Sequence, residues 1–257
     1  MANDLLQETT VTAQYSTPVV NRLIGSMPDK ARARLLAHCT PEQLVFGDVL
    51  CDTTKPISHI YFPLTGFISL VAAVSGHRPI EMGMIGNEGM LGATLHLGIA
   101  IAPLQAIVQG PGSALRMTTA QFRMQLRDSP ELQRTLEGYL YVLIEQLTQT
   151  AVCNSFHEVQ ARLARWLLMT HDRSHSDQFH LTHLFLAQML GVRRSAVTIA
   201  AGELQRQKLI RYTRGQITIC SRRGLEEASC ECYVAGVSAY DRRLPVTGKM
   251  TACMSPH

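Results

Sequence analysis

The stretch that decides the fold spans residues 181–198 and reads LTHLFLAQMLGVRRSAVT. Thr182 is suited to cap a helix in which Leu186 and Leu190 would lie on one inward face. Gly191 can adopt a positive φ without a clash at Cβ, so a second helix can leave at a steep angle. The stretch therefore predicts two helices joined by a tight turn.

The second predicted helix has an apolar face and a polar face. The apolar face recurs at offsets of zero, three, four and seven residues, at Val197, Ala200, Ala201 and Leu204. The polar face carries Arg194, Ser195 and Thr198. An arginine at the start of an exposed helix can bond to O6 and N7 of guanine, and hydroxyl side chains can reach phosphates or base edges. This helix is therefore predicted to lie in the major groove of DNA.

A hairpin follows the second helix. Residues 209–212 and 216–219 predict two strands, and Thr213-Arg214-Gly215 joins them with an arginine at the tip. Such a hairpin is typical of a wing that lies beside the DNA backbone. The residues predicted to contact DNA are Thr182, His183, Arg193, Arg194, Ser195, Thr198 and Arg214.

Positive charge is concentrated in the same part of the chain. Residues 193–223 hold eight basic residues and one acid, a net charge of +7, whereas the whole chain carries +4 and the remainder therefore −3. A solvated basic face is the alternative interpretation. A local concentration of this kind is typical of nucleic-acid binding.

The pattern of apolar and turn-forming residues changes along the N-terminal half of the sequence. Residues 1–17 are polar and without periodicity, which predicts a mobile tail, and residues 18–38 predict two short helices joined near Pro28. From residue 42 to residue 117, short apolar runs alternate with turns rich in glycine and proline, which predicts antiparallel strands in a barrel or jelly roll. The runs are residues 44–46, 57–62, 67–74, 80–85, 105–108 and 114–117.

A long helix is predicted to begin at Pro130, with Ser129 as its N-cap. An apolar seam recurs along it at steps of three and four, comprising Leu132, Leu136, Tyr139, Leu143, Leu147 and Thr150. Such a seam is typical of a coiled coil, so these six residues are predicted to form a dimer interface. The alternative is that the seam covers the chain's own strands. Dimerisation is favoured because Leu140, Val142 and Ile144 on the opposite side would let the helix pack both ways.

The remaining sequence gives weaker signals. Residues 172–180 predict a loop, and residues 222–243 predict a helix followed by a tail without a pattern. The seven cysteines are scattered and odd in number, which indicates reduced thiols, and only Cys230-Glu231-Cys232 forms a tight pair. No second pair or histidine stands near it in the sequence, so no metal site is predicted. No stretch resembles a membrane span or a signal sequence, so a cytoplasmic location is expected.

Residues 161–219 resemble the Crp/Fnr family of bacterial transcription regulators. The resemblance rests on ARLARWL at 161–167, on the helix-turn-helix and on LQRQKLI at 204–210. It implies an α+β chain with a jelly-roll sensor similar to cyclic-nucleotide-binding domains, a long dimerisation helix and a winged helix-turn-helix. It also implies a homodimer that binds double-stranded DNA and contacts RNA polymerase. The expected segments are residues 1–17 (tail), 18–128 (sensor), 129–155 (dimerisation helix), 156–221 (DNA-binding domain) and 222–257 (C-terminal helix and tail).

The recognition helix departs from the family pattern. Family members often begin this helix with Ser-Arg-Glu and carry a further arginine four residues after the glutamate. The corresponding positions here are Arg193, Arg194, Ser195 and Ile199. Only the central arginine is kept, so the base preference is expected to differ.

The sensor departs further from the family. Members that bind cyclic nucleotides carry a Gly-Glu-x-Ala/Ser segment and then an arginine for the cyclic phosphate. The nearest match makes Gly86, Glu88 and Gly89 the expected effector-pocket residues, but residues 102–106 lack the arginine. Cyclic AMP is therefore disfavoured, because its phosphate would lose a bidentate, charge-assisted contact.

No cofactor is predicted. An iron–sulfur cluster is disfavoured because the N-terminal cysteine cluster of the iron–sulfur members is missing. Haem stays open because His59, His77 and His96 are available, although a lone histidine among strands is more often structural.

These observations predict a sequence-specific DNA-binding regulator that responds to an unidentified signal, and not an enzyme. One alternative is a constitutive DNA-binding protein with a vestigial sensor. Another is a cupin-like metalloenzyme, which is disfavoured because His77 and Glu81 lie near each other without the paired histidines that a cupin metal site needs.

Overall fold

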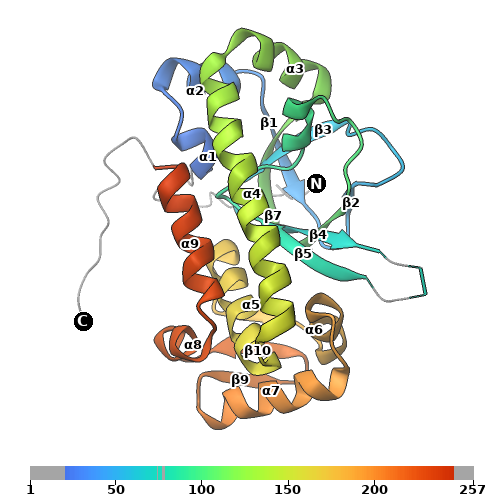
Figure 1. Cartoon of the computed structure of the whole chain (residues 1–257), viewed down its shortest axis with the longest axis vertical. Coiled ribbons are helices and arrows are strands. Elements are labelled where there is room, and N and C mark those ends of the chain that lie inside the picture. Colours follow the sequence, from blue (N-terminus) through green and yellow to red (C-terminus); the bar gives the residue numbers. More distant parts are fainter. Residues whose placement is uncertain (1–20, 74, 77–78, 246–257) are drawn as a thin grey trace, which may run out of the picture.

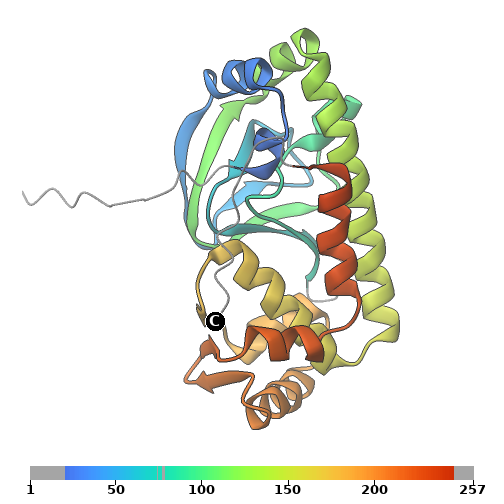
Figure 2. The same cartoon turned by 90° about the vertical axis from the view of Figure 1, so that its left-hand side faces the viewer.

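The structure is a computed structural model that describes residues 21–73, 75–76 and 79–245. The predicted tail at residues 1–17, His77 and most of the predicted C-terminal tail lie outside these ranges. A β domain and a winged domain lie at opposite ends of the molecule, and the long helix α4 (Pro130–Phe156) extends from one toward the other (Figures 1 and 2). The predicted α+β class is confirmed.

The β domain consists of two antiparallel sheets, in the strand orders β1-β7-β3 and β2-β6-β4-β5. The strands are β1 (Thr40–Leu44), β2 (Val49–Cys51), β3 (His59–Pro63), β4 (Phe67–Ala72), β5 (Ile80–Ile85), β6 (Gln105–Gly110) and β7 (Gly112–Thr118). They confirm the predicted antiparallel domain, although the described strands do not close into a barrel. The first predicted strand was misplaced, because Val45 and Phe46 are exposed and precede a turn at Gly47, whose φ is +89°.

Several helices lie beside the β domain, and α4 begins at its predicted cap. The short helices α1 (Arg22–Gly25) and α2 (Asp29–Leu36) confirm the predicted pair, and a 3-10 helix, η1 (Ala93–Leu97), follows β5. Helix α3 (Thr119–Asp128) leads into α4. Ser129 caps α4 by accepting a hydrogen bond from the Leu132 amide at 3.2 Å.

The apolar seam of α4 packs against the sheets of its own chain. Leu132, Leu136 and Tyr139 are buried in the core of the β domain. A side chain buried there cannot also face a second chain, so the alternative interpretation, cover for the chain's own strands, holds for these three residues. Of the other seam residues, Thr150 is buried, and Leu143 and Leu147 are partly exposed.

The winged domain contains α5 (Val159–Ser174), α6 (His183–Leu190), α7 (Arg194–Arg206) and the sheet order β8-β10-β9. Its strands are β8 (Gln178–His180), β9 (Ile210–Thr213) and β10 (Gln216–Ile219). Strand β8 corrects the predicted loop: its neighbours are polar, but Phe179 is buried and pairs in register with Ile217. In the described ranges no single helix is long and apolar enough to cross a membrane, and only the sharply bent pair α6 and α7 together meets that test of length and composition.

The predicted C-terminal helix is broken in two. Helix α8 (Arg222–Ala228) ends where Ser229 adopts an extended backbone, and α9 (Cys232–Arg243) then runs back beside α4 (Figures 1 and 2). The break falls at the Cys230-Glu231-Cys232 pair.

The two domains share apolar packing. Phe67 of β4 and Met84 of β5 belong to the core of the winged domain. The Phe67 ring meets Trp166 of α5 edge to face, with centroids 6.5 Å apart. The winged domain therefore rests on one sheet of the β domain.

Candidate nucleic-acid interface

Helices α6 and α7 have the geometry of a helix-turn-helix. They are bent by 108° relative to each other, within the range of about 90–120° of this motif. The Thr182 hydroxyl accepts a hydrogen bond from the Phe185 amide at 3.1 Å, and Gly191 has a φ of +64°. The predicted cap and glycine turn are confirmed. A Cβ on Gly191 would lie 2.5 Å from Ile80 Cδ1 of β5, so the turn also contacts the β domain.

Helix α7 buries its apolar face and exposes its polar one. The predicted inward residues Val197, Ala200, Ala201 and Leu204 are all buried. Arg194 and Ser195 on its first turn are exposed, Arg193 precedes it, and Ile199 is 74% exposed. No other described part of the chain covers this face, so a major groove, which admits an α-helix, can receive it.

Two of the residues predicted to contact DNA are used inside the domain. The Thr198 hydroxyl donates to the Arg194 carbonyl at 3.1 Å and lies 3.0 Å from His183 Nδ1. The His183 ring stacks on Tyr212 of β9, with centroids 4.2 Å apart. Burial and the charge of Arg194 lower the pKa of His183, which favours the neutral ring. His183 and Thr198 therefore join the two helices to the wing.

The wing places basic side chains next to α7. Strands β9 and β10 pair in register, with Thr213 opposite Gln216, and Arg214 and Gly215 form the tip. Both tip residues have positive φ, +50° and +83°, which turns the Arg214 side chain into an exposed position at the end of the hairpin.

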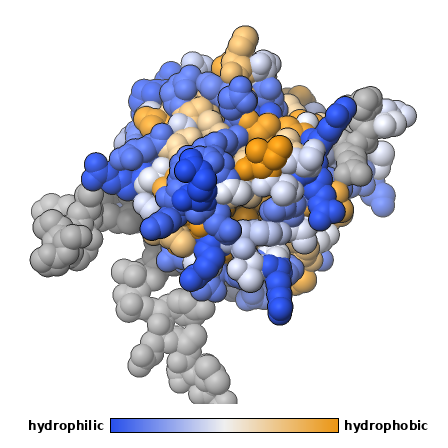
Figure 3. Space-filling model, turned by 90° about the horizontal axis from the view of Figure 1, so that it is seen from below, coloured by the Kyte–Doolittle hydropathy of each residue, from blue (hydrophilic) through white to orange (hydrophobic). Residues whose placement is uncertain are grey.

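The basic cluster of residues 193–223 separates into two groups. Arg206, Arg222 and Arg223 form ion pairs with acidic residues, and these pairs neutralise much of their charge. The other five are exposed and have no ion pair in the part of the chain that the structure describes: Arg193, Arg194, Lys208, Arg211 and Arg214. Strongly hydrophilic side chains project from this end of the molecule, with apolar ones between them (Figure 3).

Comparisons with known proteins agree with this geometry. A family model described as the Crp-like helix-turn-helix domain matches residues 161–228. FixK2 from Bradyrhizobium japonicum superimposes with a TM-score of 0.63 at 15% identity, over 75% of this chain and 98% of that one. Residues 161–228 thus form a Crp-like helix-turn-helix domain, in a chain with the fold of Crp/Fnr-family structures. The matched Crp-like helix-turn-helix domain favours a transcription regulator over the cupin-like enzyme.

Two further structures have the same fold as this chain. The c-di-GMP-responsive regulator CLP from Xanthomonas campestris gives a TM-score of 0.61 at 16% identity, over 75% of this chain and 99% of that one. A Crp/Fnr-family transcriptional regulator from Thermus thermophilus gives 0.59 at 20% identity, over 74% and 98%. A search of curated protein sequences gives no match.

The turn predicted as an effector pocket is occupied by side chains of the chain itself. A Cβ on Gly86 would lie 2.5 Å from Arg173 Cγ, and one on Gly89 would lie 2.3 Å from the Tyr139 hydroxyl oxygen. The Glu88 carboxylate forms an ion pair with Arg173 at 2.6 Å. The two glycines therefore make room for protein side chains, and of the three predicted residues only Glu88 lines a cavity.

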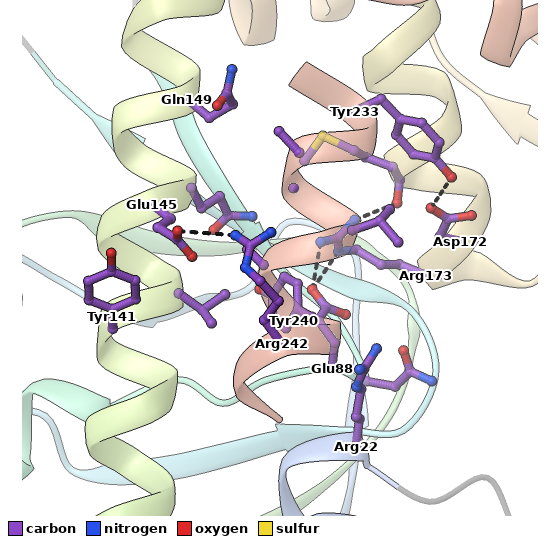
Figure 4. Close-up of a pocket in the computed structure, with 18 of the residues that line it drawn as sticks. Arg22, Glu88, Tyr141, Glu145, Gln149, Asp172, Arg173, Tyr233, Tyr240 and Arg242 are labelled. Atoms are coloured by element: carbon purple, nitrogen blue, oxygen red, sulfur yellow. Dashed lines mark hydrogen bonds and ion pairs between the residues drawn. The ribbon is translucent and has the colours of Figure 1, made fainter. Parts of the chain in front are cut away.

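That cavity, of about 1100 Å³, lies between α4, α5 and α9 (Figure 4). Ion pairs hold its walls together, since Arg242 of α9 approaches Glu145 of α4 at 3.3 Å and Arg173 of α5 binds Glu88. Tyr233 donates to Asp172 at 2.9 Å. The cavity thus lies where the long helix, the C-terminal helix and the winged domain meet.

The haem candidates among the described residues have other neighbours. His59 Nδ1 lies 3.0 Å from the Ser58 hydroxyl, and His96 Nε2 lies 3.9 Å from Glu137.

A buried carboxylate links the two domains and was not predicted. Glu81 of β5 accepts hydrogen bonds from Ser69 of β4 at 2.5 Å and from Trp166 Nε1 of α5 at 2.9 Å. Burial raises the pKa of Glu81 to about 7, although both hydrogen bonds and the charge of Arg173 act in the opposite direction. Glu81 and Trp166 are 85 positions apart, as are Glu88 and Arg173, so no local sequence signal could have paired them.

Proposed function

We propose that this chain is a Crp/Fnr-type regulator that binds double-stranded DNA as a homodimer, with its two α7 helices in successive major grooves of a roughly palindromic site. The exposed face of α7 carries the proposal, because Arg194 stands there without an acidic partner among the described residues. Arg194 would read guanine, Ser195 would reach base edges or phosphates, and the apolar Ile199 suits the methyl group of thymine. Further phosphate contacts are proposed for Thr182, Arg193 and Arg214. His183 and Thr198, which bond to each other, are proposed to position the two helices instead.

The role of Arg194 in base reading can be tested in two steps. The preferred duplex is selected from a random DNA library, and affinities are then measured at one fixed salt concentration. Arg194→Ala should weaken binding to the selected site about 10- to 100-fold and leave a scrambled duplex little affected. Arg214→Ala should weaken both duplexes alike, because a phosphate contact does not depend on sequence. Arg223→Ala is the matched control, since Arg223 is exposed but already paired with Glu227 at 3.1 Å. Full sequence preference in Arg194→Ala would show that another residue reads the site.

The dimer is proposed to form on the outward face of α4. Tyr141, Ile144 and Val152 are exposed there, and Tyr141 and Ile144 also line the rim of the cavity between α4, α5 and α9. Together with Thr148 they recur at steps of three and four, the spacing of one helix face. A second copy of α4 would cover this face. Of the predicted seam residues, only the partly exposed Leu143 and Leu147 are still proposed to contact the second copy.

The signal is proposed to act at the cavity between α4, α5 and α9. A ligand there would contact Glu88, which is already paired with Arg173 of the winged domain. Its binding could then shift the winged domains of the dimer relative to each other. Mass spectrometry of natively purified protein tests this: a retained small molecule supports a sensor, and its absence supports the constitutive alternative. A cytoplasmic location and a contact with RNA polymerase complete the proposal.

A further inference from the structure

Four metal-ligating side chains meet where the long helix ends. Cys153 lies in the last turn of α4 and His157 is its C-cap, while Cys230 and Cys232 stand at the break between α8 and α9. The three thiols are buried and the histidine is largely so. The fold thus adds a third cysteine and a histidine to the pair for which the sequence predicted no metal site.

The four ligand atoms have the spacing of ligands around one metal ion. All lie within 4.8 Å of one another, the Sγ atoms of Cys153 and Cys230 being 3.6 Å apart and Cys232 Sγ 3.4 Å from His157 Nδ1. A tetrahedral ion with bonds of about 2.3 Å to sulfur and about 2.0 Å to nitrogen holds two sulfurs about 3.8 Å apart and sulfur and nitrogen about 3.5 Å apart. A disulfide would instead place the two Sγ atoms about 2.05 Å apart.

Neighbouring side chains supply the environment that such ligands require. His157 Nε2 lies 3.1 Å from Glu231 Oε1, which leaves Nδ1 directed at the sulfurs. Gln149 Nε2 donates to Cys232 Sγ at 2.9 Å. A carboxylate that accepts the second ring N–H of a ligating histidine fixes its tautomer and its orientation, as in many zinc sites.

We propose that Cys153, His157, Cys230 and Cys232 bind one Zn²⁺ ion in a closed tetrahedral site. Three thiolates and one imidazole are a ligand set of structural zinc sites, and since the protein supplies all four ligands, no position is left for water or substrate. An iron–sulfur cluster fits less well. Such a cluster distributes its thiolates over different iron atoms, which places them farther apart than the ligands of a single ion.

The ion would fasten the C-terminal extension to the joint between the two domains. Helix α5 begins at Val159, two residues after His157, and α9 begins at Cys232 and runs beside α4. Zinc bound here fixes the direction in which α4 passes into the winged domain. It also couples the folding of residues 222–243 to the metal.

Metal analysis of the reduced, full-length protein tests the proposal. About one zinc ion per chain is expected after purification. The Cys230→Ser/Cys232→Ser double variant should lose it, and Cys220→Ser, which removes an exposed thiol outside the cluster, should keep it. Reduced protein that takes up no zinc, a double variant that retains it, or iron together with acid-labile sulfide would each overturn the proposal.

Two further measurements keep the test decisive if the cysteine variants fold poorly. Cobalt(II) titrated into chelator-treated wild-type protein should produce the visible bands of a tetrahedral ion and thiolate-to-cobalt charge transfer, and a titration without them overturns the site. Glu231→Gln keeps all four ligands and should lower zinc affinity about 10- to 100-fold at unchanged stoichiometry. Unchanged affinity in this variant would overturn the role of the carboxylate in positioning His157.

Discussion

Glu81 is a single residue on which contacts from both domains converge. Its carboxylate is buried and holds Ser69 on one side and the Trp166 indole on the other. The favourable interactions do not fully compensate the loss of hydration, so the pKa rises from 4.5 to about 7. The protonation of this contact therefore changes near neutral pH.

Glu81→Gln should remove a pH-dependent part of the stability. Between about pH 4.5 and pH 7 the folded protein binds more protons at Glu81 than the unfolded protein, so the free energy of unfolding falls as the pH rises through this window. Above pH 7 the effect is constant. A pKa shift from 4.5 to about 7 corresponds to a change of about 3 kcal/mol in the free energy of unfolding. The glutamine amide can still bond to both partners, and the variant should lack this fall.

Chemical denaturation at pH 5 and pH 8 measures the difference. Glu42→Gln, a partly exposed site on β1, is the control and should retain the wild-type fall. If Glu81→Gln and wild type lose equal stability between the two pH values, Glu81 is ionised throughout.

At the scale of elements, the sequence predicted those that local chemistry determines. Ser129 begins α4 and Gly191 ends α6, because a cap and a positive φ depend on the residue itself. Strand β8 and the break before α9 escaped prediction, because distant partners determine both. The two faces of α4 were also recognised, but periodicity cannot say which face meets the chain's own sheets and which one meets another molecule.

A pair of substitutions on α4 separates folding from association. Leu136→Ala opens a cavity in the core and should lower the free energy of unfolding by about 2–5 kcal/mol. Ile144→Glu, at a side chain 60% exposed, should leave monomer folding nearly unchanged but place two charges in the proposed dimer interface. Sedimentation analysis should then find Leu136→Ala dimeric and Ile144→Glu monomeric. A dimeric Ile144→Glu would exclude this face of α4 from the interface.

At the scale of the whole molecule, buried contacts connect the sensor and the winged domain. Glu88 follows β5, Arg173 lies on α5, and their side chains are only 13% and 8% exposed. The helix-turn-helix also contacts the sensor, because its turn residue Gly191 lies against Ile80 of β5. A movement of the turn after β5 must therefore be shared by α5, which carries the rest of the winged domain.

Glu88→Gln tests how strongly this pair joins the domains. The variant leaves the Arg173 guanidinium buried without its carboxylate, and breaking a buried ion pair in this way costs about 3–5 kcal/mol. Arg173 keeps its bond to the Met169 carbonyl at 2.8 Å, so we expect a loss near the lower value. Chemical denaturation gives the stability, and faster amide exchange in α5 should accompany the loss.

Two comparisons show whether the unpaired charge causes that loss. Glu42→Gln breaks the pair with Arg116, whose side chains are 34% and 33% exposed, and should change stability by no more than about 1 kcal/mol. Glu88→Gln/Arg173→Met removes both charges and fills similar space, so it should regain most of the stability lost in Glu88→Gln. If the double variant is no more stable than the single one, packing rather than charge holds α5 to the sensor, and a signal would have to act through the shared apolar core.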